Sequence, residues 1–317
     1  MRKILILGSS GFIGKNLSLF FKKKKQFKCY GTFLKNYPKI LKNKIILKKV
    51  DLKNGKEVSK LFKEVKPDIV IQAAATTSGA KDILSKPYMH VNDNAIINSV
   101  VTKACFDSQI KHFIFFSCTV MYKASKKYLK EKDFNANEEM YPNYFGAGWM
   151  KIFVEKLCEF YSRISDIKFT IIRHSNIYGP QDKYDLEKSH VFGATITKVM
   201  KAKKNIVIWG EGSESRDLLH VDDLMNFVYK AIFKQKKRFD IYNVGSSKNI
   251  SIKNLAEKII RHSGKKVDIK FDLSKKSLKN SVKINIEKSK KDIGWAPKIS
   301  IDSGIKKTLM WYKDNFK

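Results

Sequence analysis

Acidic residues and arginine are scarce in this chain. Among its 317 residues, 64 are Lys or Arg and only 30 are Asp or Glu, which gives a formal net charge of +34. Only six of the 64 basic residues are arginine, and the lysines are spread along the whole chain. Nucleic-acid surfaces favour the bidentate guanidinium of arginine and cluster their basic residues on one face. The charge therefore indicates a lysine-rich composition with no specific nucleic-acid partner, and a nucleic-acid binder stays as an alternative.

Cysteine and long apolar runs are scarce as well. The four cysteines form no CxxC pair, so the sequence indicates neither a disulfide framework nor a metal site. No apolar run approaches the ~18 residues that span a bilayer, and the first apolar segment runs straight into glycines, unlike a signal peptide. We therefore expect a reduced, cytoplasmic protein with no membrane partner. A hydrophobic share of 43% still provides a real core.

Short apolar segments alternate with amphipathic ones through the first half, which is typical of βαβ units and a parallel sheet. The expected fold is α/β, with a doubly wound parallel Rossmann sheet over residues 1–173 and a smaller C-terminal substrate-binding lobe over 174–317. A later segment near 215–243 is expected to pack back on the sheet. The expected strands are Lys3–Leu7, Lys28–Thr32, Ile45–Lys48, Asp68–Gln72, His112–Phe116 and Lys168–Ile172, and the expected helices are Gly11–Lys24, Lys56–Val65, Asn92–Phe106 and Asn143–Ile164.

Three glycines with GxxGxxG spacing follow the first expected strand. Small residues there let the backbone turn tightly, and the free amide groups of a helix N-terminus attract an anionic pyrophosphate. Because these glycines lie between a first strand and a first helix, they indicate a dinucleotide site rather than a bare turn. The residues of this turn expected to bind the cofactor are Gly8, Gly11, Phe12, Ile13 and Gly14.

The ordered motifs resemble those of the extended short-chain dehydrogenase/reductases, which are NAD(P)-dependent epimerases, dehydratases and reductases of nucleotide sugars. They include Asn176-Ile177-Tyr178-Gly179-Pro180 and Arg216-Asp217, and the similarity extends over essentially the whole chain. Within that family, the segment YGPQDKYDLEKSHV is similar to the GDP-L-fucose synthases, which epimerise and reduce a 4-keto-6-deoxy-mannose nucleotide. The resemblance implies a nucleotide-sugar partner, a homodimer, and further cofactor-binding residues, namely Asp51, Leu52, Ala73, Ala74, Ala75 and Lys151.

The residues after the second expected strand bear on the choice of cofactor. Relatives that prefer NAD usually end this strand with an acid that binds the ribose hydroxyls, and this chain has none there. Lys35 follows the strand instead and could meet a 2′-phosphate. We therefore expect NADP or NAD, with NADP favoured.

The resemblance also implies positions for an acid–base site and a phosphate site. His190 matches an acid/base histidine, although an ordinary histidine at a helix N-terminus is the alternative. Arg216 matches a phosphate-binding arginine and Asn176 a contact near the same group. Cys118, with Thr119 beside it, stands where the family has Ser or Thr. Its thiol either faces the pocket or fills a small buried apolar position.

The main departure from the family pattern is Ala147, where relatives carry a tyrosine one turn before Lys151. The nearest upstream tyrosine is Tyr144, which a continuous helix would place within about 20° of the same face as the lysine. Tyr144 is therefore a relocated acid–base group, a substrate clamp or a packing residue. The neighbouring Gly146 and Gly148 indicate a kink or a close approach of substrate.

These positions together predict an NAD(P)-dependent epimerase/reductase acting on a keto-deoxy-sugar nucleotide. Lys151 would hold the nicotinamide ribose, Tyr144 or a water would handle the proton, and His190 with Cys118 would enolise the carbons beside the ketone. Two alternatives stay open: another 4-epimerase or dehydratase of the same family, and a cofactor-binding protein that lost its chemistry with its tyrosine. Arg173, directly after a strand, is either a phosphate ligand or a structural residue.

Overall fold

The computed structural model describes residues 1–76, 87–186, 189–275 and 281–316. Its centre is a seven-stranded sheet with the order β11-β7-β5-β4-β1-β2-β3, and every neighbouring pair is parallel. The carboxyl ends of all these strands therefore meet at one edge, where open α/β sheets bind ligands. The strands are β1 (Arg2–Leu7), β2 (Phe27–Phe33), β3 (Ile46–Lys49), β4 (Ile69–Gln72), β5 (His112–Cys118), β7 (Lys168–His174) and β11 (Phe239–Val244).

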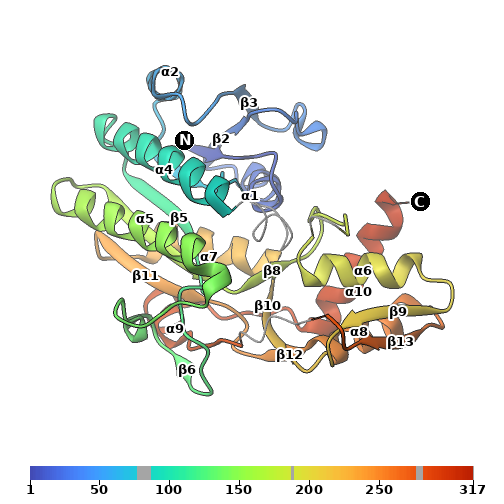
Figure 1. Cartoon of the computed structure of the whole chain (residues 1–317). Helices are drawn as coiled ribbons and strands as arrows, with labels where there is room; N and C mark the ends of the chain where they lie inside the picture. Colours follow the sequence, from blue (N-terminus) through green and yellow to red (C-terminus); the bar gives the residue numbers. More distant parts are fainter. Residues whose placement is uncertain (77–86, 187–188, 276–280, 317) are drawn as a thin grey trace.

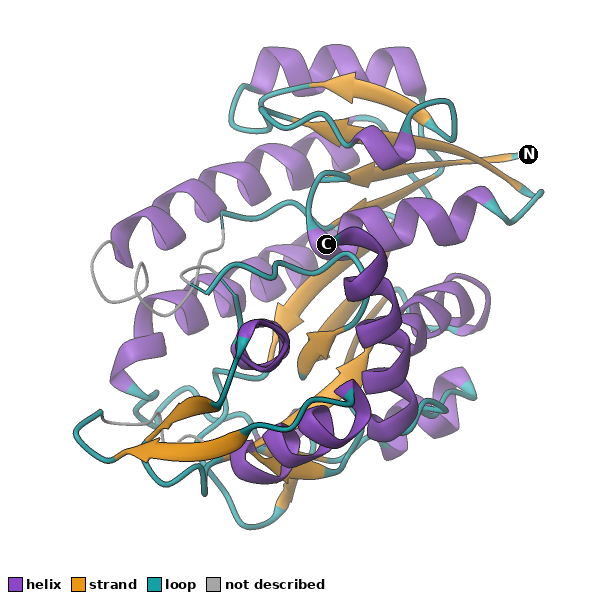
Figure 2. Ribbon diagram, turned by 90° about the vertical axis from the view of Figure 1, so that its right-hand side faces the viewer, coloured by secondary structure: helices purple, strands orange, loops and turns teal. Residues whose placement is uncertain are grey.

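Helices cover both faces of this sheet, as its two-sided apolar strands require. On one face, α1 (Phe12–Lys22), α7 (Val221–Lys234) and α9 (Glu287–Ile293) share a hydrophobic core with the strands. On the other face, the second core contains α2 (Gly55–Val65), α4 (Pro87–Asp107) and α5 (Phe145–Arg163). Figure 1 shows α4 and α5 side by side, and Figure 2 shows helices flanking the strands.

The α/β fold class predicted from the sequence is confirmed, and so are the expected strands and helices. Most of their ends lie within two residues of the expected positions. The helix expected from Asn92 is the exception, because it begins at Pro87. Proline suits the first position of a helix, since its fixed φ is already helical and its missing N–H would have no partner there.

The remaining elements form a smaller lobe with a core of its own. This core contains residues of α6 (Val191–Lys201), α8 (Ile252–Ser263) and α10 (Ile301–Asn315), which gather on one side in Figure 1. The division at residue 173 stays a prediction, although α7 and β11 lie in the sheet layer. The short strands of this part are β8 (Asn176–Tyr178), β9 (Asn205–Trp209), β10 (Ser215–His220), β12 (Asn249–Ser251) and β13 (Asp268–Asp272), while β6 (Tyr128–Leu129) pairs with β14 (Lys283–Ile284).

Three short 3-10 turns complete the described elements: η1 (Lys39–Leu41), η2 (Glu131–Asp133) and η3 (Pro142–Tyr144). Within the described ranges, each helix is too short or too polar to cross a bilayer.

Candidate active site

The glycine turn between β1 and α1 is built so tightly that side chains would not fit. Gly8 has φ +81°, and a Cβ there would lie 2.6 Å from the Cα of Ala74 at the end of β4. A Cβ on Gly14 would lie 2.1 Å from the Gly8 carbonyl oxygen, so α1 packs directly against the turn. These contacts bring the predicted cofactor residues Gly8, Gly14 and Ala74 together at the carboxyl edge.

The N-terminus of α1 is left open to a ligand. Its N-cap, Gly11, offers no side-chain cap within the described residues, so the amides of Phe12 and Ile13 have no side-chain acceptor from the cap. The turn is fixed from below by β2, because Gly8 N donates to Thr32 Oγ1 at 3.0 Å and Ser9 N donates to the Thr32 carbonyl at 2.7 Å. A positive helix end on a side-chain-free turn fits the pyrophosphate of a dinucleotide.

The other predicted cofactor residues follow neighbouring strands of the sheet. Lys35 is exposed just after β2, and the Asp51 carboxylate accepts a hydrogen bond from Lys53 N at 3.0 Å just after β3. Leu52 is buried, Ala73 and Ala74 are half-buried after β4, and Ala75 is exposed. All of these positions lie at the carboxyl edge that carries the glycine turn.

Cys118 and Lys151 lie at the carboxyl end of β5, the next strand along the sheet. The Lys151 ammonium on α5 donates to the Phe116 carbonyl at 2.7 Å and lies 4.7 Å from the centre of the Phe115 ring. Burial raises the pKa of the Cys118 thiol, and the Lys151 charge offsets part of that shift. Cys118 also packs beside Met121, Met140 and Ile152, so it combines an apolar contact with a place next to the lysine. Thr119 follows it in the bend after β5.

Tyr144 precedes the regular helix that carries Lys151, so the helical spacing expected between the two residues does not apply. The residue ends the η3 turn and forms the N-cap of α5, with φ −110° and ψ 3°, before the regular helix begins. Burial raises the pKa of its phenol, and the Arg216 charge offsets part of that shift while Cys118 adds to it. Tyr144 is therefore within electrostatic range of both Cys118 and Arg216, through a different route from the one predicted.

Gly146 and Gly148 make room for protein side chains. A Cβ on Gly146 would lie 2.8 Å from Val91 Cγ2, and one on Gly148 would lie 2.5 Å from Met140 Sδ. The helix α5 continues through both positions. These contacts indicate that the small residues serve the packing of α5 against α4 and the segment around Met140.

The predicted substrate residues come from the lobe. Asn176 on β8 donates to the Asp217 carbonyl at 3.2 Å, and Arg216 on the neighbouring strand β10 donates to the Ser215 carbonyl at 2.8 Å. His190 is the N-cap of α6 but makes no side-chain capping bond within the described residues. The residue as a whole is exposed, yet loss of hydration among surrounding protein atoms and the Lys183 charge lower the pKa of its imidazole.

Arg173 has a structural role. Its guanidinium and the Glu155 carboxylate on α5 form an ion pair at 2.6 Å with both side chains buried, and Ser117 Oγ donates to the same carboxylate at 2.6 Å. Burial opposes the charge of Arg173, but the Glu155 hydrogen bonds and charge outweigh it and raise the pKa of the guanidinium. The pair joins β5, β7 and α5 beneath the site.

Sequence reasoning missed His174, the last residue of β7. The ladder between β5 and β7 pairs it with Cys118, so the two residues are neighbours at the sheet edge. Its Nδ1 lies 2.7 Å from the Ser175 carbonyl oxygen, and its ring centre lies 6.1 Å from that of Phe116. Matching the ends of the two expected strands would have found this pairing, because parallel neighbours end at the same edge.

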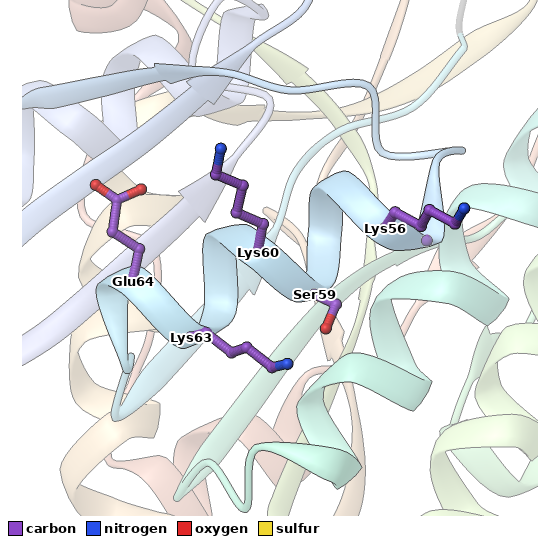
Figure 3. Close-up of a pocket in the computed structure, with 6 residues that line it drawn as sticks. Lys56, Ser59, Lys60, Lys63 and Glu64 are labelled. Carbon is purple, nitrogen blue, oxygen red and sulfur yellow. The ribbon is translucent and has the colours of Figure 1, made fainter.

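A separate hollow of about 760 Å³ lies along the outer surface of α2. Figure 3 shows Lys56, Lys60 and Lys63 projecting from this helix, with Ser59 and Glu64 beside them. It is a shallow lysine-rich groove and contains none of the predicted site residues. The described residues contain no cluster of three or more His, Cys, Asp or Glu side chains that could hold a metal ion.

Comparison with known proteins bears directly on this arrangement. The family described as NAD dependent epimerase/dehydratase matches residues 4–245. The GDP-L-colitose synthase of Yersinia pseudotuberculosis is 27% identical over 316 residues, covering 98% of this chain and 97% of the relative. The GDP-L-fucose synthase of Sinorhizobium fredii is 30% identical over 272 residues, covering 84% of this chain and 86% of the relative. The family resemblance drawn from the sequence is thereby confirmed.

Solved structures show the same fold. The UDP-glucose 4-epimerase of Thermotoga maritima superposes with a TM-score of 0.87 at 21% identity and covers 100% of both chains. A GDP-6-OMe-4-keto-L-xylo-heptose reductase from C. jejuni gives a TM-score of 0.84 at 23% identity, covering 99% of this chain and 98% of that one.

Proposed function

Because the chain belongs to the NAD dependent epimerase/dehydratase family, we propose that it epimerises and reduces a keto-deoxy-sugar carried on a nucleotide. Its relatives confirm the predicted class, an enzyme of nucleotide-sugar epimerisation and reduction. The observation that carries the proposal is the single edge of the sheet that presents both the open α1 N-terminus and the cluster of Cys118, Lys151 and Tyr144.

The cofactor-binding residues and the catalytic residues have separate proposed roles. The glycine turn and the amides of Phe12 and Ile13 would hold the dinucleotide phosphates, and Lys151 would hold the nicotinamide ribose. A bound nicotinamide dinucleotide would supply the hydride for reduction. We propose NADP as this cofactor, since Lys35 rather than an acid follows β2 and its side chain is exposed. Tyr144, half-buried and within electrostatic range of Cys118, would give the proton to the sugar oxygen.

The test separates enolisation from reduction. The enzyme, with NADPH and GDP-4-keto-6-deoxy-mannose in heavy water, should incorporate deuterium beside the ketone and consume NADPH. Tyr144→Phe should slow NADPH consumption by about 10²–10⁴-fold and leave deuterium incorporation nearly unchanged, because only reduction needs its proton. Adding Ala147→Tyr, one turn before Lys151, to the Tyr144→Phe variant should partly restore reduction. A chain that binds NADPH but neither exchanges nor reduces any keto-sugar nucleotide is the cofactor-binding protein of the alternative.

Arg216 is proposed to bind the diphosphate of the sugar nucleotide. It lies half-buried on β10, the strand that pairs with β8 where Asn176 lies, and within electrostatic range of Tyr144, in a chain that otherwise prefers lysine. Arg216→Ala should weaken binding of GDP-mannose by about 1.5–3 kcal/mol, the scale of hydrogen bonds to charged groups, and leave NADPH affinity unchanged. Calorimetric titration of both ligands tests this, with Arg261→Ala on α8 as the matched control.

We also propose a cytoplasmic homodimer. The four cysteines are free thiols, in keeping with a reducing compartment. The helices α4 and α5 expose Ile96, Phe153 and Phe160 at 46%, 45% and 53%, apolar surface that a second copy would cover. Light scattering should give twice the chain mass, and Phe153→Asp with Phe160→Asp should halve it, whereas Leu273→Asp in the lobe should not.

A further inference from the structure

Asp217 follows Arg216 on β10 and is buried where the arginine is not. It is 3% exposed, whereas Arg216 is half-buried and within electrostatic range of Tyr144. Successive side chains of a strand point to opposite faces, so the carboxylate lies behind the face that carries the guanidinium. A buried carboxylate is unfavourable unless both of its oxygens are hydrogen-bonded, so its partners show what holds it there.

Both oxygens of Asp217 accept hydrogen bonds from the turn that follows β11. Oδ1 accepts from Ser246 N at 2.8 Å and from Ser246 Oγ at 2.9 Å, and Oδ2 accepts from Ser247 N at 2.8 Å. Ser247 has φ +55°, a left-handed conformation that is uncommon for a residue with a side chain. A Cβ on Gly245 would lie 3.0 Å from both carboxylate oxygens, so glycine leaves room for them. The turn is therefore shaped around this carboxylate.

The same turn leads into β12, the strand that pairs with β10. The antiparallel register places Asp217 opposite Asn249 and Arg216 opposite Ile250. On the other side of β10, Asn176 Nδ2 on β8 donates to the main-chain carbonyl of Asp217 at 3.2 Å. Since β11 belongs to the central sheet and β12 to the small sheet with β10, the bonds to Asp217 fix the strand of Arg216 relative to the central sheet.

We propose that Asp217 is a positioning residue for the nucleotide sugar, because it holds β10 and the β11–β12 turn together so that the Arg216 guanidinium meets the diphosphate. This inference rests on the proposed function, in which Arg216 binds that diphosphate. Asp217 itself would not touch the ligand and acts through the arginine. Its loss should therefore weaken binding of the sugar nucleotide and leave the cofactor half unchanged.

The first test is Asp217→Asn, which keeps the shape of the side chain but turns an amide donor toward one of the N–H groups of the turn. GDP-mannose should bind about tenfold more weakly in calorimetric titration, the scale of one hydrogen bond to a charged group, and NADPH affinity should be unchanged. Loss of a negative charge alone would favour an anionic diphosphate, so weaker binding reports the position of Arg216 rather than charge. GDP-mannose affinity within about twofold of the wild type would overturn the inference.

Asp223→Asn is the matched control for a purely structural loss. Asp223 on α7 is 2% exposed, and its two oxygens accept from successive amides, Lys298 N at 3.1 Å and Ile299 N at 2.9 Å. Urea unfolding should show that both variants are destabilised, whereas only Asp217→Asn should bind GDP-mannose more weakly. Equal weakening by Asp223→Asn would mean that the loss of any buried aspartate gives the effect, which overturns the inference.

A double-mutant cycle with Arg216→Ala determines whether Asp217 acts through the arginine. In the Arg216→Ala background, Asp217→Asn should weaken GDP-mannose binding by less than about twofold, because residues that act through one another are not additive. The same loss in both backgrounds overturns the inference.

Gly245→Ala is the second variant, for the case that Asp217→Asn does not fold. Its Cβ would press on both carboxylate oxygens without changing their charge, so it should repeat the pattern of the cycle, and wild-type GDP-mannose affinity there would overturn the inference as well. If Arg216→Ala alone binds GDP-mannose like the wild type, the diphosphate assignment of the proposed function fails, and the role of Asp217 fails with it.

Discussion

The cofactor half and the catalytic half of the site meet at the same sheet edge but are built from different materials. The cofactor half is backbone: glycines without Cβ atoms, an uncapped helix end and amide donors fixed by Thr32. The catalytic half is a set of side chains from β5, β7, α5 and α6, held in place by the buried pair of Arg173 and Glu155. A backbone site depends on excluding side chains, whereas a side-chain site depends on a few buried contacts beneath it.

The largest loss of stability should come from breaking the buried ion pair of Arg173 and Glu155 beneath the catalytic half. Glu155→Gln leaves the Arg173 guanidinium buried without its countercharge, which should cost about 3–5 kcal/mol of unfolding free energy. Glu159→Gln, one turn further along α5, removes only surface ion pairs to Lys156 and Arg163 and should cost about 0–1 kcal/mol.

Urea unfolding of both variants measures this contrast. A double variant with Arg173→Met and Glu155→Leu should be more stable than Glu155→Gln, because neither charge is then left buried alone. Equal losses in Glu155→Gln and Glu159→Gln would mean that the pair does not support the site.

The next largest loss of stability and cofactor binding should come from adding a side chain to the glycine turn of the cofactor half. Gly14→Ala forces α1 away from the turn, since its Cβ would meet the Gly8 carbonyl oxygen at 2.1 Å. Overpacking of this kind costs about 1–3 kcal/mol, and NADPH binding should fall at least tenfold because the helix end moves. Gly55→Ala at the start of α2 has no neighbour within 4 Å and should lower neither stability nor binding. Fluorescence titration with NADPH decides, and retained affinity in Gly14→Ala would show that the helix end is not the phosphate site.

This contrast also explains what the sequence could predict. The glycine turn, the parallel sheet and most strand ends were predictable, because GxxGxxG and alternating apolar segments are local signals. The catalytic half was only partly predictable. The place of Tyr144 depended on where α5 begins, and the pairing of His174 with Cys118 depended on the register of two strands more than 50 residues apart. The role of Arg173 depended on a partner 18 residues earlier on a different element.

The two halves are also linked by the segment that follows β8, and a carboxyl group there should make the link pH-dependent. Asn16 on α1 donates to the Pro180 carbonyl at 3.0 Å, which holds this segment against the glycine turn. Next to it, one Asp182 oxygen accepts from Lys183 N at 2.7 Å, while the other is buried with no hydrogen-bond partner in the described structure. Burial raises the pKa of Asp182 to about 7.

The last and smallest effect is therefore a loss of stability as this carboxyl ionises. The folded chain keeps the Asp182 proton up to about pH 7, whereas the unfolded chain releases it near pH 3.8, the ordinary pKa of an aspartic acid side chain. The folded state then binds more protons in that window, so the stability from Asp182 is complete below pH 3.8 and is lost as the pH rises through 7. Asp182→Asn should be about 1–3 kcal/mol more stable than the wild type at pH 8 and equal to it near pH 4. Burial lowers the pKa of His112 to about 3, so His112 makes stability rise with pH. This contribution is the same in the wild type and in Asp182→Asn, so the difference between their melting temperatures across pH isolates Asp182. Asp166→Asn, at an exposed site, should follow the wild type, and a pH-independent difference for Asp182→Asn would mean that this carboxyl is already ionised in the fold.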